Sequence, residues 1–238
     1  MMTEAEGVNS NDAVLDDPVG ESLRGHHSHL ARRYGRALTY ASPVATFVAV
    51  PVNSGPHEWA ELAALLGPDG FADMFSAPLT PPSDWQPVFT MEGVQMVGHL
   101  SKIDARETSP GVVELTDTDV PDMLELVERT RPGPFWAETI RMGTYLGIRE
   151  AGTLVAMAGE RLHPPGWTEI SAVCTAPEWR GRGFASALVR QSAARIIARG
   201  ERPFIHVVRD HTGAIDLYRQ LGFTIRRNIT FRGFRVPS

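Results

Sequence analysis

The fold of this chain is decided by the stretch Pro177-Glu178-Trp179-Arg180-Gly181-Arg182-Gly183-Phe184-Ala185. An apolar segment, residues 170–175, precedes it, and residues 184–199 follow it with the spacing of an amphipathic helix. We therefore expect a strand to end here and a helix to begin after a short Gly-rich loop. The first N–H groups of a helix lack partners and carry the positive end of its dipole. Because two glycines allow close backbone approach and two arginines add donors, the stretch predicts a site for a phosphorylated ligand.

Composition is typical of a soluble globular protein. The 238 residues are 42% hydrophobic and 21% charged, enough for one large domain or two small ones. No apolar run reaches the roughly 20 residues of a membrane span, and the N-terminus lacks the pattern of a signal peptide. Cys174 is the only cysteine, which excludes an intrachain disulfide and fits a reducing compartment. We therefore expect a cytoplasmic protein with no membrane partner.

Charge is distributed unevenly along the chain. Residues 1–110 carry 14 acidic and six basic side chains, a net charge of −8, whereas residues 111–238 carry 14 acidic side chains and 17 arginines, a net charge of +3. The second half thus suits an anionic ligand. It is not basic enough to favour nucleic acid and contains no nucleic-acid motif, so we expect no nucleic-acid partner.

Three segments are expected along the chain. Residues 1–17 hold five acids and no base and predict a disordered tail, residues 18–107 an N-terminal accessory region, and residues 108–238 the main domain. The boundary is placed in the polar stretch 104–111, and four prolines make residues 78–87 a loop. In the accessory region, the pattern predicts helices over 23–34 and 57–66 and strands over 45–50 and 94–103.

The main domain shows a clearer alternation of strands and helices. Strands are predicted over 112–115, 145–149, 153–162, 168–174, 204–208 and 223–231, and helices over 119–130, 135–142, 184–199 and 214–221. The segment Glu150-Ala151-Gly152 indicates a hairpin turn. The fold class is therefore α/β (α+β), a mixed sheet with antiparallel hairpins and one strand–loop–helix crossover.

Two segments of this domain resemble the motifs of the GNAT (general N-acetyltransferase) superfamily. Residues 169–185, EISAVCTAPEWRGRGFA, are similar to its motif A, and residues 214–223, AIDLYRQLGF, are similar to its motif B. The two occur in order, and the resemblance covers residues 111–238. It implies the GNAT fold, a mixed central sheet with a splayed strand pair and flanking helices. The pattern further resembles the glycine N-acyltransferase-like branch, in which residues 18–107 would be a degenerate GNAT-like half.

The resemblance implies an N-acetyltransferase that moves an acetyl group from acetyl-CoA to an amine without a metal. Val173, Cys174 and Thr175 would then offer backbone groups to the pantetheine arm. The pyrophosphate would be bound by the backbone of Arg180, Gly181, Arg182, Gly183, Phe184 and Ala185. Relatives often carry a cofactor-contacting Asn where this chain has His211, whose imidazole can also donate a hydrogen bond.

Three side chains are candidates for the proton transfers of such a reaction. Tyr218, a phenol with an ordinary pKa near 10, can protonate a departing thiolate whose pKa is near 8.5. An amine acceptor arrives as ammonium and must lose a proton, which a carboxylate can take. Glu169, at the start of the motif A strand, is the first candidate for this base, and Glu160 on the preceding strand is the second.

Several alternatives stay open at the level of the sequence. The acceptor can be a small amine, an amino acid, an antibiotic or a peptide N-terminus, and the N-terminal half can shape its pocket, form a homodimer, or do neither. A non-catalytic acyl-CoA-binding sensor is the rival function. A dinucleotide-binding fold is disfavoured, because Ser186 occupies the third position of its glycine fingerprint.

Other chemistry-bearing residues have simpler interpretations. Cys174 beside His206 is interpreted as a core cysteine rather than a nucleophile. His26, His27 and His29 are interpreted as surface histidines, because no nearby Cys or acid completes a metal site. Phe135, Trp136 and Met142 are either core residues or the lining of an acceptor pocket.

Overall fold

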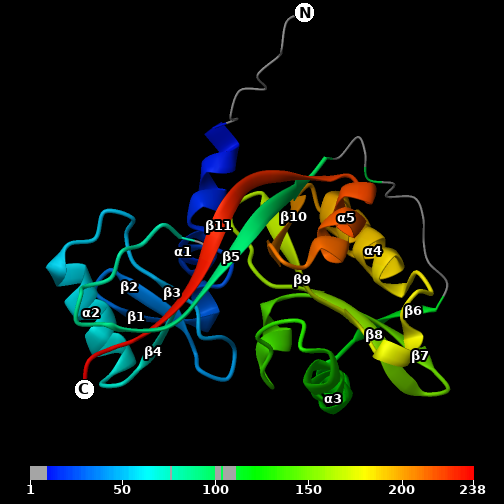
Figure 1. Ribbon diagram of the computed structural model, residues 1–238, viewed down its shortest axis with the longest axis horizontal. Coiled ribbons are helices and arrows are strands. Elements are labelled where there is room, and N and C mark those ends of the chain that lie inside the picture. The colour runs from blue at the N-terminus through cyan, green and yellow to red at the C-terminus, as the bar shows by residue number, and fades with distance from the viewer. Residues whose placement is uncertain (1–9, 76, 100–102, 104–110) are drawn as a thin grey trace, which may run out of the picture.

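The computed structural model describes residues 10–75, 77–99, 103 and 111–238. Its main element is an eight-stranded mixed sheet (Figure 1), built from β4 (Phe71–Phe75), β5 (Gln86–Gly98), β6 (Val112–Leu115), β7 (Tyr145–Glu150), β8 (Thr153–Glu160), β9 (Trp167–Thr175), β10 (Arg202–Val208) and β11 (Phe223–Arg235). The strand order is β4-β11-β5-β10-β9-β8-β7-β6. A smaller antiparallel sheet contains β1 (Ala31–Tyr34), β2 (Ala37–Tyr40) and β3 (Val48–Ala49).

Helices cover the main sheet on both faces. The α-helices are α1 (Pro18–Arg24), α2 (Pro56–Leu66), α3 (Val120–Thr130), α4 (Phe184–Ala198) and α5 (Thr212–Gln220), and the 3-10 helices are η1 (Ser10–Asp16), η2 (Ser28–Leu30), η3 (Asp117–Asp119), η4 (Thr139–Met142) and η5 (Pro177–Trp179). Leu154 of β8 packs in the cluster that contains α3, and the next residue, Val155, packs in the cluster that contains α4. Because successive strand residues point to opposite faces, α3 and α4 lie on opposite faces of the sheet. No helix within the described ranges is both long and apolar enough to cross a membrane.

The long strands β5 and β11 join the two halves of the chain. They pair antiparallel from Phe223↔Gly98 to Arg235↔Gln86, and they cross the molecule side by side from the vicinity of α5 toward α2 (Figure 1). Strand β11 also pairs with β4, and β5 with β10. Strands from both sides of the expected boundary therefore belong to one sheet. The boundary stretch itself, 104–110, lies outside the described residues.

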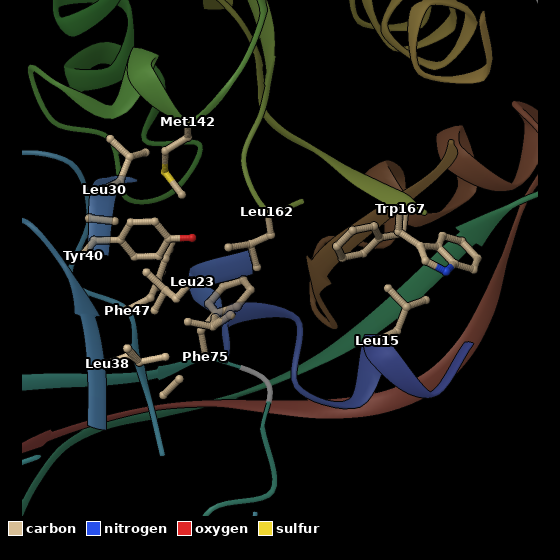
Figure 2. Packing of buried hydrophobic residues seen from close by; sticks show 14 of the residues in the cluster. Leu15, Leu23, Leu30, Leu38, Tyr40, Phe47, Phe75, Met142, Leu162 and Trp167 are labelled. Carbon is tan, nitrogen blue, oxygen red and sulfur yellow. The ribbon is translucent and has the colours of Figure 1, made fainter. Parts of the chain in front are cut away.

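The prediction of a disordered tail is wrong for residues 10–17. Residues 10–16 form η1, and Leu15 is fully buried in a cluster with Trp167 (Figure 2). The acidic side chains have arginine partners from distant strands: Asp12 pairs with Arg202 at 2.9 Å, and Asp16 pairs with Arg226 at 2.8 Å. An acidic composition favours disorder only while the charges face water, and here the tertiary structure supplies their partners. Residues 1–9 lie outside the described part of the chain.

The other predictions for the accessory region hold only in part. Helix α2 is confirmed. The predicted helix over 23–34 is wrong, because α1 ends at Arg24 and a β1–β2 hairpin with Gly35 in its turn follows. Strand β4 was not predicted, because four of its five residues are buried and it shows no alternation.

The predictions for the main domain are largely confirmed. Strands β6 to β11 and helices α3, α4 and α5 form within a few residues of their expected bounds. The hairpin turn is made by Ala151 and Gly152, both with positive φ. The helix predicted over 135–142 is reduced to the single 3-10 turn η4.

Candidate active site

A cavity opens where the neighbouring strands β9 and β10 separate. Their parallel pairing comprises Arg202↔Trp167, Pro203↔Thr168 and Phe204↔Glu169 and goes no further. Beyond that point, residues 170–175 of β9 and 205–208 of β10 line a cavity of about 440 Å³, called the β9–β10 cavity below. The register thus confirms the splayed strand pair that the resemblance implies.

A β-bulge lies on the cavity side of β9. Met157 pairs with Cys174 and Gly159 with Ser171, so Ala158 of β8 faces two residues of β9. Ala172 adopts φ +52°, a left-handed conformation that costs a residue with a side chain roughly 1–2 kcal/mol. A bulge leaves main-chain groups outside the ladder. Backbone groups near Ala172 and Val173 are thereby available at the wall of the cavity.

The loop after β9 leads directly into the N-terminus of α4. Gly181 and Gly183 have φ +77° and +79°, and a Cβ atom at either position would meet only open space. The glycines are therefore required by backbone conformation rather than by close packing. Gly183 is the N-cap of the 15-residue helix α4 and supplies no side-chain cap, so the first amides are open to a ligand. Arg180 and Ala185 line the cavity, whereas the guanidinium of Arg182 lies 4.3 Å from the ring centroid of Trp179.

Tyr218 of α5 and Cys174 of β9 both line the β9–β10 cavity. Tyr218, on α5, is only 6% exposed, and its burial together with the neighbouring Cys174 raises its pKa to about 12. Its phenol therefore keeps its proton at neutral pH. Burial also raises the pKa of the Cys174 thiol to about 11, which fits the interpretation of a core cysteine. His211, at the N-cap of α5, is an exposed part of the lining.

Glu169 does not line the cavity and lies in a closed ionic network beneath it. The Arg161 guanidinium donates to both of its oxygens, at 2.9 and 2.6 Å, and His206 Nδ1 donates to Oε1 at 2.7 Å. Burial alone would raise the pKa of Glu169, but Arg161 and His206 lower it to about 2. A carboxylate that is permanently ionised and fully hydrogen-bonded is a poor proton acceptor, so the geometry does not fit the predicted base.

Glu160 is also placed away from the cavity. It is buried at the end of β8, where Arg199 Nη1 lies 2.9 Å from Oε1 and the backbone N–H of Thr144 donates to Oε2 at 3.2 Å. Both glutamates thus hold structural elements together. The structure brings together the predicted residues of β9, the loop and α5, but not these two carboxylates.

The cavity contains residues that have no local sequence signal. Asp73 and Phe75 come from β4, in the other half of the chain, and meet Arg161 and His206 through the fold alone. Further lining residues are Phe89, Met91 and Phe231 from the long strands and Thr130, Arg131, Pro132, Gly133 and Pro134 after α3. Only the pairing of β4 with β11 could have placed Asp73 there.

The aromatic residues considered for an acceptor pocket belong to the core. Phe135 and Met142 are buried in two hydrophobic clusters, and Trp136 packs against one of them. None of the three is among the described residues that line the cavity.

The histidines of the accessory region form a packed aromatic cluster. His27 is fully buried, which corrects its interpretation as a surface residue, and ligand atoms of His26, His27 and His163 lie within 4.8 Å of one another. Both ring nitrogens of His27 are engaged, by the Tyr40 hydroxyl at 2.8 Å and the Met142 carbonyl at 2.9 Å. The rings of His26 and His163 stack with centroids 4.5 Å apart. This geometry fits ring packing better than convergence on a metal ion.

Part of the chain is similar in sequence to a known protein family and to a known acetyltransferase. A family model described as FR47-like protein matches residues 145–231. N-alpha-acetyltransferase RimI of Mycobacterium tuberculosis (strain ATCC 25618 / H37Rv) is 36% identical over 97 residues, which span 40% of this chain and 60% of that protein. The matched part therefore covers less than two thirds of this relative.

Solved structures extend the similarity to nearly the whole chain. A GNAT-family acetyltransferase from Novosphingobium aromaticivorans DSM 12444 is 37% identical with a TM-score of 0.83, and the match covers 94% of this chain and 99% of that one. A GCN5-related N-acetyltransferase from Kribbella flavida shares the fold, at 14% identity and a TM-score of 0.62, over 92% of this chain and 95% of that one. Assignment to the glycine N-acyltransferase-like branch stays a prediction. With its splayed strands, its open helix N-terminus and a full-length relative of this similarity, the chain belongs to the GNAT family of acetyltransferases.

Proposed function

We propose that this protein transfers an acetyl group from acetyl-CoA to a primary amine by direct attack of the amine. The observation that carries the proposal is the continuous surface formed by the bulged strand β9, the open N-terminus of α4 and the cavity between β9 and β10. This surface offers unpaired amides for a diphosphate and a narrow apolar gap for a pantetheine arm. Family membership supports the same donor.

Each wall of the cavity has a role in binding the donor. The backbone of Val173, Cys174 and Thr175 would hold the pantetheine, and the amides of residues 181–185 would hold the pyrophosphate. The amide of Arg180 already donates to the Pro177 carbonyl at 3.3 Å, so this residue would contribute through its side chain. The exposed side chain of His211 would donate to the cofactor. Acetyl-CoA would supply the activated acyl group, and the protein would supply position, because binding both reactants removes a large entropic barrier.

Tyr218 serves in this proposal as the general acid. Its O–H donates a proton to the thiolate sulfur as the carbon–sulfur bond breaks. The amine bonded to the acyl carbon gives up a proton to solvent, and the Tyr218 phenolate takes a proton from solvent to become a phenol again. A main-chain N–H near the bulge at Ala172 would stabilise the developing oxyanion. Glu169 and Glu160 have no part in these steps, because their oxygens are bound elsewhere.

The acceptor class is not set by the family. The Mycobacterium tuberculosis relative is named as an N-alpha-acetyltransferase, which places α-amino groups among the candidates, beside small amines. Loops and accessory elements set such preferences, and here β4 of the accessory region reaches the cavity.

Calorimetric titration with acetyl-CoA, followed by an assay of free thiol release with a panel of amines, tests the proposal. We expect saturable binding and amine-dependent thiol release. Binding without thiol release for any amine would favour the acyl-CoA sensor instead. No binding, with no shift in melting temperature, would refute both functions.

A further inference from the structure

Asp73 is the only carboxylate among the described residues that line the β9–β10 cavity. Its side chain is buried, with the residue only 4% exposed. Oδ2 accepts a hydrogen bond from the Thr46 hydroxyl at 3.3 Å, and Oδ1 has no hydrogen-bond partner among the residues that the structure describes. A buried acceptor without a partner is costly to the folded state, so its persistence in a cavity points to a ligand that completes it.

The strand register surrounds this carboxylate with apolar side chains. Asp73 lies opposite Gly233 of β11, which in turn lies opposite Phe89 of β5. Two residue pairs further along, Phe75, Phe231 and Met91 lie side by side, and because the side-chain direction of a strand repeats every two residues, they share the same face. Gly233 places no side chain between Asp73 and Phe89, and a Cβ atom there would collide with the Phe89 ring. The carboxylate therefore faces the cavity from an apolar, largely aromatic wall.

The positively charged group near Asp73, the guanidinium of Arg161, is already paired with Glu169. Arg161 interacts electrostatically with Asp73, but its guanidinium donates to both oxygens of Glu169 and lies 4.5 Å from the Phe75 ring centroid. His206 donates from Nδ1 to Glu169, and its Nε2 lies 3.1 Å from the Gln95 amide nitrogen. The amide nitrogen of Gln95 can only donate a hydrogen bond, so His206 Nε2 must accept it. His206 is therefore neutral, with its one ring proton on Nδ1. Asp73 is thus left with a net negative charge that a cation can balance.

We propose that Asp73 binds the ammonium group of the acceptor and removes its proton, and that the acceptor is a primary amine on an apolar body without a carboxylate. This inference rests on the proposed function, because it assigns the second substrate of the same cavity. The ammonium loses one proton to Asp73 Oδ1, and the freed nitrogen lone pair forms the bond to the acyl carbon. The leaving sulfur takes its proton from Tyr218, the nitrogen now bonded to the acyl carbon loses its second proton to solvent, and the Tyr218 phenolate regains a proton from solvent. Asp73 returns its proton to solvent after the product leaves.

The electrostatics of the site support both the role and the substrate class. Burial raises the pKa of Asp73 to about 6, against the opposing effects of Arg161 and the Thr46 hydroxyl. A carboxylate with that pKa is ionised at neutral pH and is a stronger base than an exposed one. A free amino acid would bring its own carboxylate into this wall, where Asp73 repels it and Arg161 is bound to Glu169. The aromatic row favours an apolar body instead.

Thiol release should be measured with three acceptors that share one ring: 2-phenylethylamine, L-phenylalanine amide and L-phenylalanine. We expect the first two to be used and L-phenylalanine to react at least tenfold less efficiently. Asp73→Asn should lower kcat/KM for 2-phenylethylamine by about 10²–10⁴, the range for loss of a general base. The matched control Asp84→Asn changes an exposed aspartate and should leave kcat/KM unchanged.

Two readouts besides rate separate a catalytic role from a structural one. In the wild type, kcat/KM should fall as pH decreases through about 6. In Asp73→Asn, kcat/KM should no longer show this decline at acidic pH. The melting temperature of Asp73→Asn at pH 7 should equal or exceed that of the wild type, because the substitution removes an unbalanced buried charge. Thr46→Val removes the hydrogen bond that the Thr46 hydroxyl donates to the Asp73 carboxylate, so the pH at which kcat/KM falls should shift upward.

The outcomes also distinguish this inference from the proposed function. An active wild type whose kcat/KM, pH profile and acceptor preference survive Asp73→Asn would overturn the inference alone. Preference for L-phenylalanine over 2-phenylethylamine would overturn the substrate class. A wild type that neither binds acetyl-CoA nor releases thiol would refute the proposed function and the inference with it.

Discussion

Burial and local partners together set the pKa of each titratable side chain around the cavity. Burial alone raises the pKa of an acidic group, and a positively charged partner can reverse that shift. Tyr218 is buried with no charged partner in the described part of the chain, and its pKa rises to about 12. Glu169 is more deeply buried, but Arg161 and His206 lower its pKa to about 2. Asp73 is buried with weaker compensation, and its pKa rises to about 6. Burial and local partners thus give these three side chains different pKa values, which suit the proposed acid Tyr218, the fixed anion Glu169 and the proposed base Asp73.

Tyr218→Phe removes the proposed general acid without changing the packing of the ring. We expect kcat to fall by about 10²–10⁴ with the affinity for acetyl-CoA nearly unchanged, because the phenol acts on the leaving group rather than on binding. Thiol release and calorimetry measure the two quantities. Tyr34→Phe, at an exposed position, is the matched control. Full activity in Tyr218→Phe would remove this residue from the mechanism.

Glu169→Gln tests the fixed anion. The folded state depresses the pKa of Glu169, so its stabilising contribution is present above pH ~4.5 and is lost as pH falls toward 2. We expect the substitution to cost about 3–5 kcal/mol at pH 7, because it leaves Arg161 as an unpaired buried charge. Urea unfolding at pH 7 and pH 3 measures this, and the difference between wild type and variant should shrink at the lower pH. An equal difference at both values would contradict the ionised assignment.

Among the elements, the unit β9–loop–α4 is the proposed binding site of the donor, and the two ends of helix α4 can be tested separately. Helix α4 begins after Gly183 and is followed by Gly200, and both glycines have φ near +80° with open space where a Cβ would lie. Gly183 lies at the N-terminus, where the free amides are, and Gly200 lies at the opposite end. They form a matched pair for separating backbone strain from ligand binding.

Gly183→Ala and Gly200→Ala should each lower the free energy of unfolding by about 1–2 kcal/mol, because both force a side chain into a left-handed conformation. Only Gly183→Ala should weaken acetyl-CoA binding, by at least tenfold, because the loop must distort around the helix N-terminus. Chemical denaturation and calorimetry give the two values. Equal affinity for acetyl-CoA in the two variants would show that the loop geometry does not matter for binding.

The sequence predicts elements whose signals are local. The Gly-rich loop, the helix after it and the second motif lie within residues 169–223, and their strands, helices and splay form as expected. Strand β4 and Asp73 could not be placed, because their position depends on pairing with β11, more than 150 residues away. The ion pairs of Glu169 and Glu160, which do not suit the predicted role of a base, could not be foreseen for the same reason: their arginine partners become neighbours only in the fold.

For the whole molecule, the two halves share one sheet and one cavity. Residues of β4 from the first half and of α5 from the second half line the same space, and η1 packs against Trp167 of β9. The accessory region therefore takes part in the core of the acetyltransferase. Its contribution to stability should be cooperative with that of the rest of the chain.

Leu15→Ala tests this cooperation. Leu15 is fully buried in the cluster that includes Trp167 (Figure 2), so the substitution should lower the free energy of unfolding by about 2–5 kcal/mol. The exposed Val52→Ala should change it by less than about 0.5 kcal/mol. Urea unfolding followed by tryptophan fluorescence measures both. A disordered tail over residues 1–17 would instead make Leu15→Ala as neutral as the control.

Hydrogen exchange with and without acetyl-CoA tests the central claim most directly, because it reports which amides the donor covers. We predict that acetyl-CoA slows exchange at residues 171–175 of β9 and 181–187 at the start of α4, while the far end of α4, residues 194–198, stays unchanged. Unaltered exchange in both of the first two segments at a saturating concentration, or protection confined to other parts of the chain, would contradict the account.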